Sequence, residues 1–281
     1  MKDMKVFCKI KVLLLQRKGI KSIIKNGILL YGFFQKEFGM AGKIVYIKEC
    51  IDMKLQLEKA SESYIVGVML AIAGGYLDVY TYICRGGVFA NAQTGNIVLL
   101  GINIADQNWS KILFYMYPIM AFMAGILITE YVRRKFRYNP GLHWRQIVIV
   151  IEFIVLWVIA FIPSGVCDDV INSAVSFVCS MQVESFRRFN GSAYATTMCT
   201  GNLRSATEQL FYYNINKDKE ARKKSLQYYG IILFFILGAV LGTAVTRAFM
   251  ETSVLIVCLL LLVVFVIMFI PPAVEEQPKA Q

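Results

Sequence analysis

The sequence has few of the residues on which most enzyme active sites depend. It contains one histidine, His143, in 281 residues, and that histidine lies in a basic segment. Its seven cysteines show no CxxC spacing and no Cys/His pattern, so neither a zinc site nor a Cys/His nucleophilic pair is indicated. No Walker motif is present, which argues against an ATP-driven machine. We therefore expect no enzymatic activity, no cofactor and no metal site.

Charged residues are also scarce. They make up 17% of the chain, whereas hydrophobic residues make up 57% and the mean hydropathy is +0.55. Soluble domains usually carry about 25% charged residues. Apolar runs close to the roughly 20 residues that cross a bilayer recur from residue 64 to residue 270. These features predict an all-α polytopic membrane protein whose partner is the lipid bilayer.

The positive charge is concentrated ahead of the first apolar run. Residues 1–60 hold 13 Lys/Arg and 5 Asp/Glu, which supplies +8 of the formal net charge of +11. The remainder is too small to suggest binding of nucleic acid, and the basic segment favours a cytoplasmic N-terminus. We interpret residues 1–60 as a disordered extension or as sequence ahead of the true start, for which Met53 is a natural candidate. An amphipathic helix on the membrane surface is the alternative.

The tripeptide Thr-Gly-Asn occurs twice within the apolar part of the chain, at 94–96 and at 200–202. A shift of 106 positions superimposes the two copies and also carries Asp78 onto Glu184. Duplicated polar segments inside a hydrophobic chain are a sequence sign of a transporter or channel site.

Eight segments are candidate membrane helices, namely 63–84, 88–104, 112–132, 146–162, 170–186, 192–210, 226–246 and 253–270. We assign them to one transmembrane domain, 63–270, with repeats at 63–132 and 168–248 and a short polar tail at 271–281.

The number of crossings depends on the two polar segments. If all eight segments cross, the basic loop 133–145 lies outside the cell, against the positive-inside tendency. If 88–104 and 192–210 instead enter and return on the same side, all the basic loops become cytoplasmic. The chain then has six spans, and its two halves form a 3+3 inverted repeat. Eight spans in a 4+4 parallel repeat are the alternative.

Two stretches, GGYLDVYTYICRGGVFANAQTGNIVLLG and YATTMCTGNLRSATEQL, resemble the YoaK family, also described as the domain of unknown function 1275. The resemblance covers about residues 64–270. It implies a bacterial plasma-membrane protein with a transporter-like role, and it supplies no substrate or reaction. Second repeats of the family often carry Gln-Asn where this chain has Gln182-Val183, so the pairing of Asp78 with Glu184 is sensitive to a one-residue gap.

The repeated segments offer chemistry suited to a polar solute. Glycine permits close approach of helices, threonine can cap a half-helix, and asparagine both donates and accepts hydrogen bonds. A half-helix starting near each threonine would favour an anionic group at its N-terminus. Asp78 is the sharpest candidate, because a carboxylate in mid-span costs at least about 2.5–3.5 kcal/mol and usually faces a cavity. An ion pair with Arg85 could neutralise Asp78, and Arg187 could neutralise Glu184.

The sequence therefore predicts a binding site for a small polar solute or ion, formed by Asp78, Asn91, Gln93, Thr94, Gly95, Asn96, Gln182, Glu184, Thr197, Thr200, Gly201 and Asn202. Glu152 is placed near the cytoplasmic interface, close to Arg145. The leading hypothesis is a gradient-driven carrier or channel, in which Asp78 carries a proton or cation. A non-transporting membrane sensor or assembly partner is the alternative, and the oligomeric state stays open.

Overall fold

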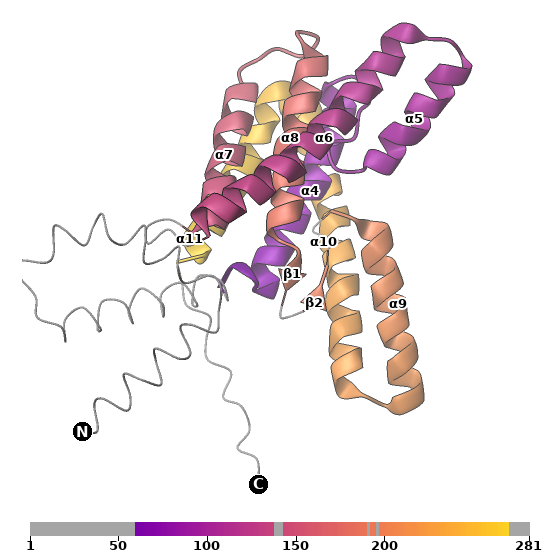
Figure 1. Ribbon diagram of the computed structural model, residues 1–281, viewed down its shortest axis with the longest axis vertical. Helices are drawn as coiled ribbons and strands as arrows, with labels where there is room; N and C mark the ends of the chain where they lie inside the picture. The colour runs from indigo at the N-terminus through magenta and orange to yellow at the C-terminus, as the bar shows by residue number, and fades with distance from the viewer. Residues whose placement is uncertain (1–59, 138–142, 190–191, 195–196, 270–281) are drawn as a thin grey trace, which may run out of the picture.

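The computed structural model describes residues 60–137, 143–189, 192–194 and 197–269, which form a helical bundle with one short β-hairpin (Figure 1). The polar tail 271–281 and all but the last residue of the extension 1–60 lie outside the described residues. In chain order the elements are α4 (Tyr64–Cys84), α5 (Gln93–Ala105), α6 (Trp109–Phe136), α7 (Trp144–Ile159), α8 (Asp168–Ser185), β1 (Arg188–Phe189), β2 (Ser192–Ala193), α9 (Cys199–Asn216), α10 (Lys219–Phe249), the 3-10 helix η1 (Met250–Val254) and α11 (Leu255–Ile267).

Local sequence explains where several helices begin. Ser63 accepts a hydrogen bond from the backbone N–H of Val66 and caps α4, and Asp218 caps α10 in the same way. His143 forms a capping box at the start of α7, in which its ring accepts from a backbone N–H and the Gln146 side chain accepts from the His143 N–H. The histidine of this chain therefore has a structural role.

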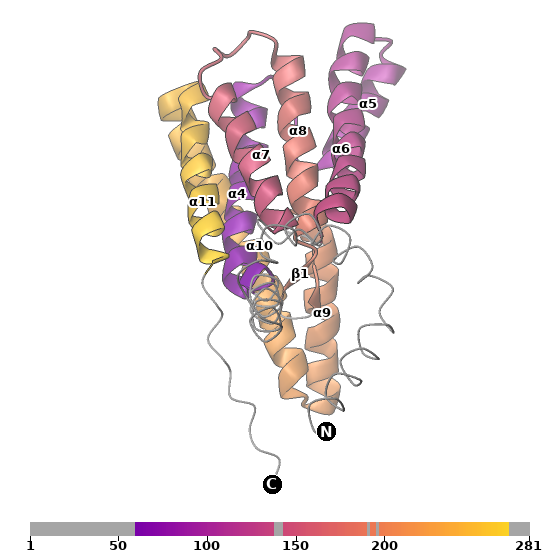
Figure 2. The same ribbon diagram turned by 60° about the vertical axis from the view of Figure 1, so that its left-hand side comes forward.

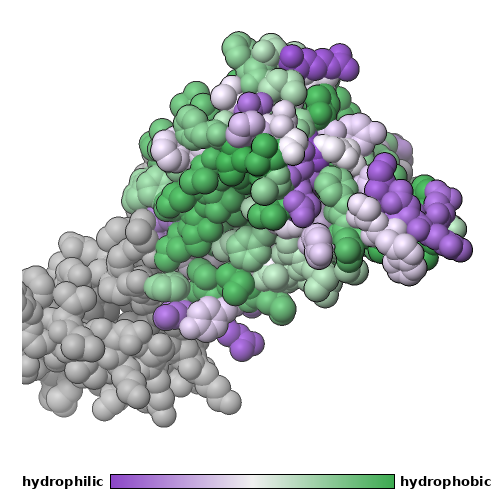
Figure 3. Space-filling view, turned by 90° about the horizontal axis from the view of Figure 1, so that it is seen from above, coloured by the Kyte–Doolittle hydropathy of each residue, from purple (hydrophilic) through white to green (hydrophobic). Residues whose placement is uncertain are grey.

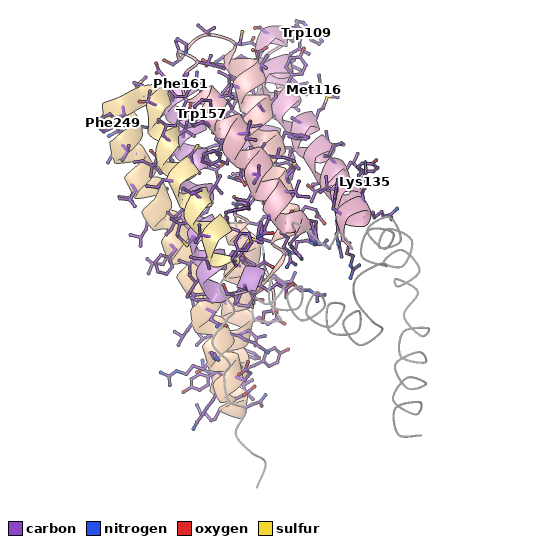
Figure 4. The ribbon with its side chains drawn as sticks, turned by 90° about the vertical axis from the view of Figure 1, so that its left-hand side faces the viewer. Trp109, Met116, Lys135, Trp157, Phe161 and Phe249 are labelled. Atoms are coloured by element: carbon purple, nitrogen blue, oxygen red, sulfur yellow. The ribbon has the colours of Figure 1, made fainter. Side chains whose placement is uncertain are left out.

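A buried arginine marks the upper end of the bundle. Arg85, which follows α4, is fully buried and donates a hydrogen bond to the carbonyl of Ile162 at 2.8 Å. It also pairs with Asp168 at 3.2 Å. Ile162 lies in the α7–α8 connection and follows Phe161, which is labelled near the top of Figure 4, and Asp168 is the first residue of α8. Thus α4 and α7 end, and α8 begins, at this upper end.

A second buried arginine marks the lower end. Arg145, in the first turn of α7, donates to the carbonyl of Ser185 at 2.9 Å, pairs with Glu62 at 2.8 Å and bonds the hydroxyl of Ser61. Thus α4 and α7 begin, and α8 ends, at this lower end. It follows that α4 and α8 run in opposite directions.

The helices pair in a pattern that is unchanged when α4–α7 are exchanged with α8–α11. The first helix of each set packs against the third helix of the other set, so α4 lies on α10 and α8 lies on α6. The second and third helices of each set form hairpins, α5–α6 and α9–α10 (Figure 2). The fourth helix of each set packs against the first helix of the other set, so α7 lies on α8 and α11 lies on α4.

The two main pairings use glycine at matching places. Gly238 on α10 lies against the carbonyl of Ile72 on α4, and Gly125 on α6 lies against the carbonyl of Phe177 on α8. Small residues let helix backbones approach closely in a membrane, where apolar side chains alone give little preference for a partner. The third helices also run oppositely, since α6 descends from Trp109 towards Lys135 while α10 rises to end at Phe249 (Figure 4).

Helices α5 and α9 both start half-way along the bundle. After α4 ends, Gly86 and Gly87 adopt φ values of +85° and +86°, which reverse the chain. The side chain of Asn91 then reaches the carbonyl of Gly74, in the middle of α4, and α5 rises from there to the upper end (Figure 1). Thr197 lies against the same Gly74, and α9 descends from there to the lower end.

These two segments differ from the predicted helices 88–104 and 192–210. The first helix begins only at Gln93, because the residues before it are used to reverse the chain. The second begins only at Cys199, because the chain first forms the β1–β2 hairpin, in which Arg188 pairs with Ala193. Both segments therefore consist of a non-helical entry followed by a helix.

The outer surface suits a lipid environment. Three helical stretches, Tyr64–Cys84, Trp109–Phe136 and Lys219–Ile267, are long and apolar enough to cross a membrane, and the last of them comprises α10, η1 and α11. Large apolar side chains are exposed on these helices, including Leu127 on α6 and Leu241 on α10. Seen from above, hydrophobic residues cover much of the molecule and hydrophilic ones form small groups (Figure 3).

Candidate functional site

Four buried polar side chains meet along one face of α4, over the two turns from Leu70 to Asp78. They are Asp78, Asn91, Gln182 and Thr197, and we call them the central polar cluster. Each is 5% exposed or less. They come from four different parts of the chain: α4, the entry to α5, α8 and the entry to α9. All four belong to the predicted site.

The Asp78 carboxylate is directed at the start of α5. Its Oδ1 accepts a hydrogen bond from the Asn91 N–H at 2.6 Å and a longer one from the Ala92 N–H at 3.4 Å. Free N–H groups at a helix start carry partial positive charge, so a carboxylate is favoured there. The anionic group expected at this half-helix is thus supplied by the protein itself.

Three oxygen atoms of the cluster have no hydrogen-bond partner among the described residues: Asn91 Oδ1, Gln182 Oε1 and Thr197 Oγ1. The nitrogen atoms of the two amides are engaged, because Asn91 Nδ2 donates to the Gly74 carbonyl at 3.3 Å and Gln182 Nε2 donates to the Leu70 carbonyl at 3.5 Å. Buried polar atoms are rarely left without partners. Oxygen atoms in this state, beside a carboxylate, suit a cation or a solute that offers hydrogen-bond donors.

Gly74 allows the two halves of the chain to meet at this cluster. A Cβ atom at position 74 would collide with the methyl group of Thr197, so only glycine fits without displacement. Asn91 and Thr197, which both contact Gly74, are 106 positions apart, the same shift that relates the two Thr-Gly-Asn copies. The repeat found in the sequence therefore converges on one point of α4.

The first Thr-Gly-Asn copy fastens the entry to α5. Asn96 accepts a hydrogen bond from the Phe89 N–H at 3.0 Å and donates to the Phe89 carbonyl at 2.7 Å and to the Gln93 side chain at 2.9 Å. Gln93 in turn donates to the carbonyl of Ala90 at 3.0 Å. Asn96 and Gln93 therefore hold the loop in shape, next to the central polar cluster and outside it.

The two Thr-Gly-Asn copies are similar in which of their side chains are buried. Asn96 and Asn202 are buried, whereas Thr94 and Thr200 are exposed. Of the two glycines, Gly95 is half-buried and Gly201 is exposed. The structure therefore does not bring Thr94, Gly95, Thr200 or Gly201 into the central polar cluster.

The charged residues near the cluster have partners other than Asp78. Arg85 binds Ile162 and Asp168, so the alternative in which Arg85 neutralises Asp78 is wrong. Glu184 lies in the last turn of α8 and pairs with Arg187 at 3.2 Å, as the ion-pair interpretation predicts. The carboxyl that a shift of 106 relates to Asp78 therefore turns away from α4.

One buried acid was misplaced by the sequence argument. Glu152, expected at the cytoplasmic interface beside Arg145, is fully buried in the middle of α7. Arg145 is occupied by Ser185 and Glu62 at the lower end. The sequence did hold a signal, since Glu152 interrupts the otherwise uncharged run IVIVIEFIVLWVI.

A helical bundle with a hydrophobic outer surface and a polar centre is an integral membrane protein of the helical class. The chain matches the family model described as "Protein of unknown function (DUF1275)" over residues 66–267, and it belongs to this family. It is 25% identical over 182 residues to the UPF0700 transmembrane protein YoaK of Bacillus subtilis (strain 168), a match that covers 62% of this chain and 79% of that protein. No solved structure matches the chain. The family resemblance and the membrane location are thereby confirmed.

Proposed function

We propose that this protein is a carrier or channel for a small polar solute or ion, which binds at the central polar cluster. The observation that carries the proposal is the meeting of Asn91 and Thr197 at Gly74, where each leaves an oxygen atom without a partner. Non-helical backbone at such depth in a membrane protein is tolerated where it is buried in protein or faces a wet cavity. Paired, interrupted helices with such backbone are typical of transporter sites.

The arrangement of the helices supports a 3+3 inverted repeat. The pairing of α4–α7 with α8–α11 is unchanged on exchange of the two sets, and α4 and α8 run in opposite directions. In this interpretation α4, α6, α7, α8, α10 and α11 are the six spans, and α5 and α9 are re-entrant from opposite sides. Opposed repeats of this kind allow a site near the midplane to open alternately to either side.

The distribution of charge supports an orientation with the lower end in the cytoplasm. That end carries Arg133, Arg187 and the basic segment from Lys217 to Lys224, whereas Asp168 and Asp169 lie at the upper end. Lys and Arg are enriched in cytoplasmic loops. Since α4 begins at the lower end, the N-terminus is then cytoplasmic, in the plasma membrane of a bacterium.

Asp78 gives the cluster its charge. A carboxylate among neutral oxygen atoms attracts a cation, or a solute with a cationic or hydrogen-bond-donating group. Transport against a gradient would draw on an ion gradient, because the sequence has no nucleotide-binding motif of the Walker type.

The proposal is tested by an uptake screen in liposomes that contain the purified protein. We expect uptake of at least one small polar solute or ion by the wild type. Thr197→Val removes one cluster oxygen at nearly constant volume, and it should lower the uptake of that solute about tenfold, as expected for the loss of about 1.4 kcal/mol of binding. Thr94→Val is the matched control, because Thr94 is exposed, and its uptake should equal that of the wild type.

Two outcomes would count against the proposal. Equal uptake by Thr197→Val and wild-type protein would remove the central polar cluster from the transport path. Absence of uptake of every solute tested, by a protein that is folded in the liposome, would favour the sensor or assembly role instead.

A further inference from the structure

Glu152 is a buried acid without a hydrogen-bond partner among the described residues. It lies in the middle of α7 with a relative exposure of 0%. Neither of its carboxyl oxygens has a hydrogen-bond partner among the described residues. None of the ion pairs formed between described residues includes it.

Two thiols on the neighbouring helices lie near Glu152. Cys179 on α8 and Cys258 on α11 both lie close enough to interact electrostatically with it. Cys179 is also within electrostatic reach of Asp78. Glu152 therefore lies beside the central polar cluster, with Cys179 as a neighbour that it shares with Asp78.

The charged groups on the other elements that pack against α7 lie towards its ends. Arg133 on α6 stacks over the ring of Trp144, in the first turn of α7. Glu251 on η1 lies within electrostatic reach of Tyr80 and Cys84, at the upper end of α4. Arg145 is held by its own partners at the lower end. Neither arginine forms an ion pair with Glu152.

An ionised carboxylate without a hydrogen-bond donor or a cation beside it is strongly disfavoured in an apolar interior. In this conformation Glu152 is therefore a neutral acid that holds a proton. Acids placed in this way within membrane spans are commonly part of proton pathways. Loss of the proton requires that water or a donor reaches the carboxyl, which links deprotonation to a change in helix packing.

We propose that Glu152 is a proton-binding site, separate from the central polar cluster, whose loading and unloading drive the movement of the solute. A hydronium ion gives its proton to one carboxylate oxygen, which leaves water and a neutral acid, and release is the reverse. The coupling role rests on the proposed transport function, whereas the binding of the proton does not.

The binding of the proton is tested by infrared difference spectroscopy of the protein in lipid, between acidic and alkaline buffer. The wild type should show a carboxylic-acid C=O band that is lost in alkaline buffer. One such band should be missing from Glu152→Gln and retained in Glu130→Gln, a control in which the replaced acid pairs with Arg133 at 2.8 Å and is partly exposed. It should also be retained in Asp78→Asn, which separates it from any band of the other buried acid. A difference spectrum of Glu152→Gln with all the carboxylic-acid bands of the wild type would overturn the proposal.

Coupling is tested in liposomes with an imposed pH gradient. Glu152→Gln should lose accumulation of the solute above its outside concentration while it retains exchange of the solute across the membrane. Accumulation by Glu152→Gln equal to that of the wild type would overturn the coupling role. A Glu152-dependent band in a protein that moves no solute would retain the proton site and reject the transport function. If Glu152→Gln does not fold, Glu152→Asp should shift the frequency of the band, and an unshifted band would overturn the assignment.

Discussion

The segments that lead into α5 and α9 both contact Gly74 on α4, but the two helix starts differ in charge. At α5 the carboxylate of Asp78 accepts hydrogen bonds from the backbone at 2.6 and 3.4 Å. At α9 the residue before the helix, Met198, provides no side-chain cap. Glu184, which a shift of 106 relates to Asp78, pairs with Arg187 instead. Both halves have a non-helical segment followed by a helix, but the electrostatics at the two helix starts differ.

In the proposed site, the two halves would therefore contribute different groups. The first half supplies the negative charge and the neutral oxygen atom of Asn91, and the second half supplies the neutral oxygen atoms of Gln182 and Thr197. The buried asparagine of each Thr-Gly-Asn copy is kept in both halves. In the proposed site, the buried asparagine of the tripeptide would serve the architecture, and residues that precede the tripeptide would supply the polar atoms that bind the solute.

The largest expected effect comes from removing the carboxylate at α5. Asp78→Ala leaves the N–H groups of Asn91 and Ala92 without their acceptor, and it should lower the free energy of unfolding by about 3 kcal/mol. Glu184→Ala breaks a pair in which Arg187 is more than half exposed, and it should cost less than about 1 kcal/mol. Unfolding in mixed detergent micelles measures both. Equal losses would show that the two acids have equivalent roles after all.

A smaller effect is expected at the two buried asparagines. Asn96→Ala removes three hydrogen bonds that hold the entry to α5, and it should lower the free energy of unfolding by about 2 kcal/mol. Asn202→Ala should cause a similar loss, because Asn202 is equally buried in the first turns of α9. The same unfolding experiment compares them. A loss at Asn96 alone would mean that the second copy no longer serves as a fastening.

The smallest effect is expected at the two glycines, and it should differ in sign. A Cβ at Gly95 would lie 2.9 Å from the ring of Phe89, which is itself stacked on Tyr82, so Gly95→Ala should destabilise by about 1 kcal/mol. At Gly201 no atom lies within 4 Å of the new Cβ, so Gly201→Ala should stabilise α9 by about 0.5 kcal/mol. Thermal unfolding of both variants checks the signs, and a stabilising Gly95→Ala would contradict the packing described for the first copy.

Much of the fold could be predicted because it depends on apolar length. The segment 63–84 became α4 at Tyr64–Cys84, and 170–186 became α8 at Asp168–Ser185. The entries to α5 and α9 could not be predicted in the same way. The sequence pattern does not distinguish them from helix, and the non-helical segments ahead of α5 and α9 are placed by contacts of Asn91 and Thr197 with Gly74 on α4.

The composition of the central polar cluster could be predicted better than its geometry. Sequence reasoning included Asp78, Asn91, Gln182 and Thr197 among its candidates, yet it could not separate these buried residues from the exposed Thr94 and Thr200. In a helix that is apolar on all sides, the sequence does not indicate which side chain faces the protein and which faces lipid. Glu152 was misplaced for the same reason.

The two buried arginines have a mechanical consequence. Arg85 joins the end of α4 to the α7–α8 connection, and Arg145 joins the start of α4 to the start of α7 and the end of α8. These three helices are thereby held together at both ends. The α5–α6 and α9–α10 hairpins and α11 lie outside this group of three helices, so a change of shape that preserves the contacts of both arginines has to take place in the hairpins or in α11.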